Sequence, residues 1–158
     1  MTANTKINRF LEIMRWAGVA LGIFFAFYLG GSPQSQFSIF AILSTVFLAG
    51  FTAIEGIFFR EGAEKIAGYG DQGEAWRRQS RIHFVAITIT MLFAWFLNWG
   101  FYAYLGIYMV LLVFFTLSAI NHFYTGLKEK FVVNTLLRPL LTILLWVATI
   151  YLLLPALN

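Results

Sequence analysis

Residues 84–127 read FVAITITMLFAWFLNWGFYAYLGIYMVLLVFFTLSAINHFYTGL and contain no Asp, Glu, Lys or Arg. A helix that crosses a bilayer needs about 20 consecutive, predominantly apolar residues, so this stretch is long enough for two crossings. Backbone polar groups inside a bilayer must be satisfied within the protein, which favours helices in runs this apolar. The stretch therefore predicts a helical hairpin that crosses a membrane twice.

Two further stretches lack all four charged residue types, namely residues 16–54 and 139–158. By the same length criterion they hold two crossings and one crossing. Gly30-Gly31-Ser32-Pro33 separates the first pair, and Pro139 suits the first turn of the last helix. We therefore predict an all-α fold, a polytopic membrane protein whose single domain (residues 1–158) is a five-transmembrane-helix bundle. The predicted spans are residues 11–30, 37–59, 79–101, 104–125 and 137–155.

The composition agrees with this class. The 158 residues are 60% hydrophobic and 19% aromatic but only 11% charged, with a mean hydropathy of +0.77. Soluble domains carry about a quarter charged residues. The aromatic content excludes intrinsic disorder, and the placement of the basic residues disfavours a nucleic-acid partner. Because there is no cysteine, disulfides, thiolate metal sites and cysteine nucleophiles are absent.

The basic residues predict the orientation. All 11 Lys and Arg fall before span one, between spans two and three, between spans four and five, or within the first five residues of the span that follows each of these segments. With five crossings these segments lie on one side, which the positive-inside rule identifies as the cytoplasm. We therefore expect a multi-pass protein of a prokaryotic inner (cytoplasmic) membrane, with its N-terminus inside and its C-terminus outside. Its first partners are then membrane lipids.

Interfacial and small residues add two expectations. An aromatic belt is predicted around the turn between spans three and four, formed by Trp95, Trp99, Tyr102, Tyr104 and Tyr108. Helix-packing contacts are predicted at a set of small and polar residues, namely Gly18, Gly22, Ala49, Gly50 and Asn98.

Few ionisable or strongly polar residues lie within or at the ends of the spans, and four of them define a candidate cluster: Glu55, His83, Asn121 and His122. Intramembrane ionisable groups are costly, so they mark candidate functional sites. With a rise of about 1.5 Å per residue, His83 and His122 both lie roughly 30 Å from the turn near Ala103. Glu55 reaches a similar depth, so the cluster is expected at the cytoplasmic boundary.

Three interpretations of this cluster remain open. Glu55, His83 and His122 could be metal ligands, because two imidazoles and a carboxylate suit zinc or non-haem iron, although no pair has metal-ligand spacing. The two histidines could instead hold a haem between spans three and four. The interpretation that we favour is a satisfied polar cluster that locks the helix ends or contacts a lipid head group or quinone. The cofactor is therefore unknown, with haem or a metal as the alternatives.

Three arginines begin the third span, and we expect them to contact anionic lipid head groups: Arg77, Arg78 and Arg81. The alternative is that they act only as a topology signal. A weak internal similarity also links residues 53–58 (AIEGIF) to residues 119–124 (AINHFY). Both segments end spans that run inward, which is typical of a duplicated helical hairpin.

From Glu55 to about Leu144 the chain resembles a family of small prokaryotic integral membrane proteins of unknown function. The resemblance is carried by Ala63-Glu64-Lys65-Ile66-Ala67-Gly68-Tyr69 followed by Gln79, by Ser118-Ala119-Ile120-Asn121-His122, and by Asn134 and Pro139. The family tends to have His at the position of Glu55, and its acidic residue is replaced around Ile82-His83. The helical layout is also similar to DoxX-type four-helix bundles, some of which are small subunits beside redox enzymes. The resemblance supports the fold and marks His122, without implying a reaction.

These observations predict a non-catalytic accessory protein or a lipid- or small-ligand-binding protein. Catalysis is disfavoured because no nucleophile-elbow pattern accompanies either histidine. One alternative is a membrane redox, metal or haem protein that uses His83, His122 and Glu55. The other is a structural subunit of a larger membrane complex, or a homo-oligomer, for which 18 Phe provide a large packing area.

Overall fold

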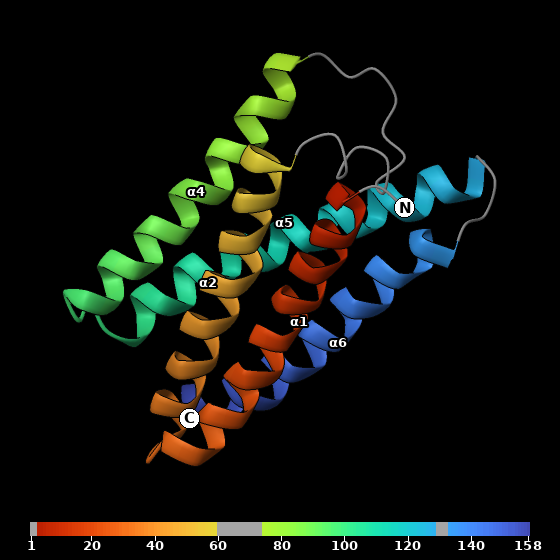
Figure 1. The fold of residues 1–158 in the computed structure, drawn as a ribbon. Helices are drawn as coiled ribbons and strands as arrows, with labels where there is room; N and C mark the ends of the chain where they lie inside the picture. Colours follow the sequence, from red (N-terminus) through yellow and green to blue (C-terminus); the bar gives the residue numbers. More distant parts are fainter. Residues whose placement is uncertain (1–2, 60–73, 129–132) are drawn as a thin grey trace.

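The computed structural model describes residues 3–59, 74–128 and 133–158, and these residues are helical apart from short connections. Figure 1 shows the helices packed as one bundle. They are α1 (Ala3–Leu29), α2 (Pro33–Phe58), α4 (Glu74–Phe96), α5 (Phe101–Lys128) and α6 (Val133–Leu157). The predicted all-α fold is confirmed for this part of the chain.

Four of the described helices are long and apolar enough to cross a membrane. Their apolar segments are Lys6–Leu29, Pro33–Phe58, Phe101–Asn121 and Pro139–Leu157. In α4 the apolar segment is only Arg81–Phe96, because Glu74, Arg77 and Arg78 occupy its first turns. The predicted third span, residues 79–101, is therefore shorter than expected, since the helix stops at Phe96 and α5 begins at Phe101.

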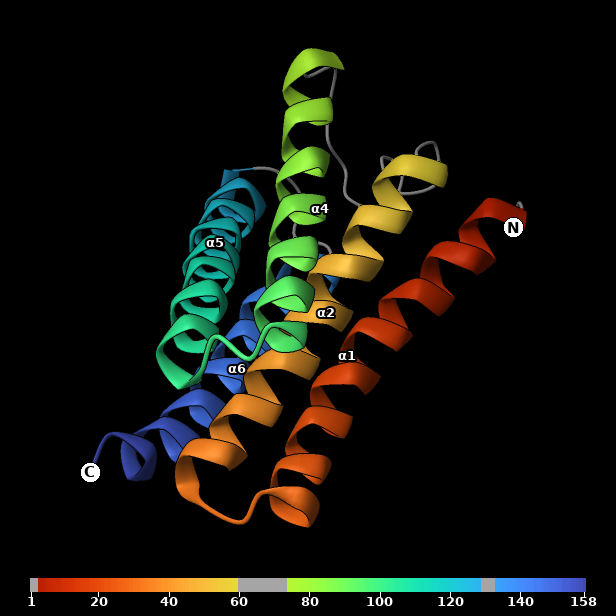
Figure 2. The same ribbon diagram turned by 90° about the vertical axis from the view of Figure 1, so that its left-hand side faces the viewer.

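α2 is the central helix of the bundle and contacts α1, α4, α5 and α6. Figure 2 shows α2 between α1 on one side and α4, α5 and α6 on the other. Three buried alanines on α2, namely Ala41, Ala49 and Ala53, let its neighbours approach closely. The position of α2 therefore determines where the other helices can lie.

The contact between α1 and α2 depends on glycine. A Cβ atom added to Gly18 would overlap Phe47 of α2, and one added to Gly22 would lie 3.2 Å from the Ser44 Oγ atom. Gly50, on the side of α2 toward α4, would place a Cβ atom 3.5 Å from Thr88 Cγ2. The predicted packing roles of Gly18, Gly22, Gly50 and the buried Ala49 are therefore confirmed.

Local capping explains both tight turns. Ser32 is the N-cap of α2, where its hydroxyl accepts from the Ser35 amide, and Pro33 opens the helix. At the end of α4, Asn98 adopts a left-handed φ of 51°. The Trp99 amide donates to the Ala94 carbonyl and the Asn98 amide to the Trp95 carbonyl, which is the Schellman arrangement. Asn98 thus reverses the chain between α4 and α5.

The predicted aromatic belt is only partly correct. Trp95, Trp99 and Tyr102 are exposed at the α4–α5 turn, but Tyr104 and Tyr108 are buried. These two tyrosines are four residues apart, so they share one face of α5, and that face is turned toward the core.

Tyr108 packs its ring edge-on against Phe37 and Phe40 of α2. The Tyr108 hydroxyl lies 2.6 Å from Thr149 Oγ1, and the Thr149 hydroxyl donates its proton to the Leu145 carbonyl. Tyr108 is consequently the donor to Thr149, which satisfies a phenol that has no access to water. This hydrogen bond ties α5 to α6.

We predict that Gly18→Ala destabilises the protein by about 1–3 kcal/mol, because the new methyl group forces α1 away from Phe47. Gly106→Ala is the matched control, since a Cβ atom there meets no atom within 4 Å. The measurement is the free energy of unfolding in mild detergent, where Gly106→Ala should cause no loss. Equal stability of the two variants would contradict the glycine-mediated contact.

Candidate functional site

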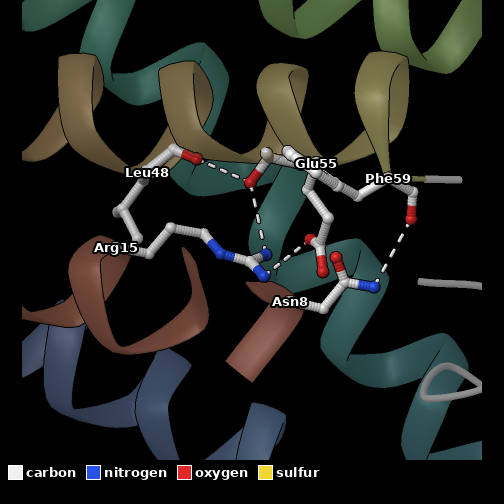
Figure 3. A network of polar contacts seen from close by, with 6 residues as sticks. Asn8, Arg15, Leu48, Glu55 and Phe59 are labelled. Carbon is white, nitrogen blue, oxygen red and sulfur yellow. Dashed lines mark hydrogen bonds and ion pairs between the residues drawn. The ribbon is translucent and has the colours of Figure 1, made fainter. Parts of the chain in front are cut away.

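A polar layer lies where α1 begins and α2 ends, and Figure 3 shows its side chains pointing toward one another. The layer comprises Asn8 and Arg15 of α1 with Thr52 and Glu55 of α2. Its centre is an ion pair in which Arg15 Nη2 lies 2.7 Å from Glu55 Oε2, with each side chain 12% exposed. The carboxylate that the sequence marks as a candidate ligand is therefore neutralised from within the protein.

Thr52 orients the arginine. The Thr52 hydroxyl donates to the Leu48 carbonyl at 2.6 Å, which uses its single proton. Its oxygen then accepts from Arg15 Nη1 at 3.4 Å. The guanidinium group is thus held between the carboxylate and a hydroxyl one turn earlier on α2, as Figure 3 shows.

Asn8 closes the layer at the end of α2. Its side chain is completely buried, and its Nδ2 atom donates to the Phe59 carbonyl at 3.4 Å. Phe59 is the C-cap residue of α2, so Asn8 satisfies a carbonyl that the helix leaves unpaired. The Asn8 Oδ1 atom has no hydrogen-bond partner among the residues described.

Arg81 approaches the same end of α2 from α4. A Cβ atom on Gly56 would lie 2.8 Å from Arg81 Cγ and 3.5 Å from Arg81 Nε. Glycine at position 56 therefore makes room for the arginine stem directly beside Glu55. Arg81 is half-buried, and it takes part in at least one further contact. The side chains of Arg77 and Arg78, the other predicted lipid contacts, lie outside the described part of the structure.

The two histidines have separate surroundings. His83 is exposed on α4, and its ring centroid lies 5.7 Å from that of Phe114 on α5. His122 lies on α5, but its side chain is outside the described residues; its neighbour Asn121 is exposed. Among the described residues, no group of three His, Asp or Glu side chains could hold a metal ion. The metal and haem interpretations therefore stay predictions.

Sequence reasoning identified Glu55 but missed Arg15, Asn8 and Thr52. The sequence does contain a pattern that points to Arg15 as the partner of Glu55. These two residues are the charged residues that border the uncharged stretch 16–54. The break at Gly30–Pro33 lies near the middle of that stretch, so an antiparallel hairpin brings its two ends together. A charge on each arm at matching depth is a candidate ion pair.

We predict that Glu55→Gln destabilises the protein by about 3 kcal/mol, because it leaves the Arg15 charge buried without its carboxylate. The double variant Arg15→Gln with Glu55→Gln should recover part of this loss, since neither charge remains. The measurement is again unfolding in detergent. Glu12→Gln is the control, because Glu12 is a half-buried carboxylate on α1, and its change should stay within about 0.5 kcal/mol. If Glu12→Gln destabilised the protein as much as Glu55→Gln does, a special role for Glu55 would be refuted.

A comparison of the chain with models of protein families, with curated proteins and with solved structures finds no match. The resemblance to small prokaryotic membrane proteins and to DoxX-type bundles therefore stays a prediction. The site has to be interpreted from its own chemistry.

Proposed function

We propose that this chain is a five-crossing protein of a prokaryotic inner membrane, with its N-terminus in the cytoplasm, that acts as a non-catalytic accessory protein and binds anionic lipid head groups. The apolar helices support a membrane location. The basic residues at one end of the bundle support the orientation, because positively charged segments are retained in the cytoplasm. The proposal concerns two questions, which are how often the chain crosses and what its inner end binds.

The direction of the helices supports a fifth crossing. In Figure 2, α2 and α5 both run upward along the chain, although α5 is inclined to α2 in Figure 1, whereas α4 runs downward. If α2 and α5 both cross, the chain has to return across the membrane between them. Among the described residues between α2 and α5, α4 is the helix that can make this return crossing. Its apolar segment of about 24 Å is short for a 30 Å core, but a long arginine side chain can reach from its inner end to the head groups.

The orientation can be tested by chemical labelling, because the chain has no native cysteine. We expect Ser32→Cys, Trp99→Cys and Asn158→Cys to react with a membrane-impermeant maleimide in spheroplasts. Glu64→Cys should react only after the membrane is permeabilised. If α4 does not cross, the Trp99 variant will instead behave like the Glu64 variant, and the five-crossing proposal fails.

One observation carries the lipid-binding proposal, namely that Arg15 already engages Glu55 at 2.7 Å beside Arg81. The inner end of α2 thus has a carboxylate that Arg15 already neutralises, and a second arginine, Arg81, whose stem lies against Gly56. Such a site favours an anion over a cation, which separates it from a metal site. The site lies at the inner end of the apolar helices, which is the depth at which the phosphate groups of lipids lie. The broad exposed apolar surface of the described helices then faces acyl chains.

We predict that the protein, purified and delipidated in mild detergent, retains phosphatidylglycerol about fivefold more strongly than phosphatidylcholine. This ratio corresponds to about 1 kcal/mol for one basic residue near the head groups. The measurement is native mass spectrometry with an equimolar mixture of the two lipids. Higher ionic strength should reduce the preference, because salt screens the attraction. Equal retention of both lipids would contradict the proposed function.

A further inference from the structure

The exposed face of α4 differs from the exposed faces of the other described helices. In those helices the exposed side chains within the apolar segments are apolar or aromatic, apart from a few near the segment ends. α4 instead exposes His83 and Thr90 within its apolar segment, and Gln79 one turn before His83. Figure 1 shows α4 at one edge of the bundle. Because these side chains are exposed, no described helix covers this face of α4.

The spacing of this face is typical of an interface between two helices. Its residues are exposed and follow one another at intervals of four, three, four and three: Gln79, His83, Ala86, Thr90 and Phe93. An average interval of 3.5 residues keeps one line of side chains turned toward a partner helix in a left-handed pair. The charged side chain in this part of α4, Arg81, lies elsewhere, with its stem against Gly56 of α2.

The polar groups of this face lack hydrogen-bond partners among the described residues. Four other threonines donate the hydroxyl proton to the carbonyl four residues earlier, namely Thr52, Thr88, Thr116 and Thr149. In the described part of the chain, neither Thr90 nor His83 makes a hydrogen bond of this or another kind. Polar groups are costly in hydrocarbon unless they are hydrogen-bonded, so a second transmembrane helix over this face would stabilise α4.

We infer that the exposed face of α4 is the surface through which two copies of this chain associate in the membrane, with their α4 helices side by side. This inference rests on the proposed crossing of α4. Two copies that insert in the same orientation have parallel α4 helices. A two-fold axis along the membrane normal then places each residue of the face beside its counterpart.

The chemistry of the face suits a second copy, because each of its polar groups can pair with an identical group. A threonine hydroxyl, a neutral imidazole and a glutamine amide each contain a donor and an acceptor, so Thr90, His83 and Gln79 are self-complementary. The symmetric pair brings no like charges together, since none of the five residues is acidic or basic in this state. Ala86 lies between His83 and Thr90, and its small side chain lets the two backbones approach.

The test uses the full chain with a fluorophore at Asn158→Cys and measures energy transfer between donor- and acceptor-labelled copies in vesicles of phosphatidylcholine and phosphatidylglycerol. Ala86→Leu should weaken association about tenfold, because the larger side chain holds the helices apart. Ala20→Leu is the matched control, since Ala20 is also an exposed alanine but lies on α1. Thr90→Val keeps the shape and removes the hydroxyl, so it should weaken association about threefold.

Cross-linking in native membranes maps the face independently. With no label and no native cysteine, Thr90→Cys should form a disulfide-linked dimer when an oxidant is added. Ile150→Cys is the control, because Ile150 is exposed on α6 and should not cross-link. Thermal unfolding checks that every variant is folded, and Thr90→Val decides the result if Ala86→Leu does not fold.

The outcomes separate this inference from the proposed function. Weaker association of Ala86→Leu than of Ala20→Leu, with a dimer of Thr90→Cys, supports the interface. A wild type that stays monomeric at every protein-to-lipid ratio, or equal association of the two leucine variants, overturns it. Cross-linking of Thr90→Cys to a protein of another mass also overturns it, because a different membrane protein then covers the face. Labelling of Trp99→Cys decides the crossing of α4 separately, so a monomer whose α4 crosses overturns this inference and leaves the five-crossing proposal intact.

Discussion

The ion pair between Arg15 and Glu55 fixes how the first hairpin closes, and the rest of the bundle is built on that hairpin. Two opposite charges that are 12% exposed at the end of an apolar hairpin favour one register, because any other register separates the two buried charges. Gly18 and Gly22 allow α1 to approach α2 closely enough for the pair to form. With α1 fixed on one side, the remaining surface of α2 is available to α4, α5 and α6.

Two hairpins with related sequences pack differently because of a few side chains. Glycines at positions 18 and 22 let α1 close on α2, whereas α4 directs Thr88 toward Gly50 of α2 and packs Phe84 against Phe114 of α5. The second hairpin finds its close contact at Gly50 and Gly56 of α2 instead. Glycine therefore shapes the contacts of α2 with α1 and with α4. The glycines lie on α1 in the first contact and on α2 itself in the second.

The helices could be predicted from the sequence, because long uncharged stretches and the Gly-Pro break give a strong local signal. Predictions of burial and of side-chain pairing were weaker, because they depend on contacts between residues that are distant in sequence. Tyr108 looks interfacial by composition, yet Phe37, Phe40 and Thr149 from two other helices enclose it. Glu55 was recognised as unusual, but its partner Arg15 is 40 residues away. The local sequence pattern of a helical hairpin does not show which faces of its two helices are in contact.

The sequence similarity between residues 53–58 and residues 119–124 relates the Glu55 carboxylate to Asn121, an amide. A carboxylate supplied by the chain is always present, so the first site is closed and its arginine contributes to folding. An amide keeps the position polar and able to donate, but it supplies no negative charge. Arg15 is therefore used within the fold by Glu55, and Arg81 packs its stem against Gly56 of the same helix. The proposed binding of anionic lipids at the membrane boundary therefore rests on the excess of basic over acidic residues, 11 against 7, and not on the Glu55 carboxylate, which Arg15 already neutralises.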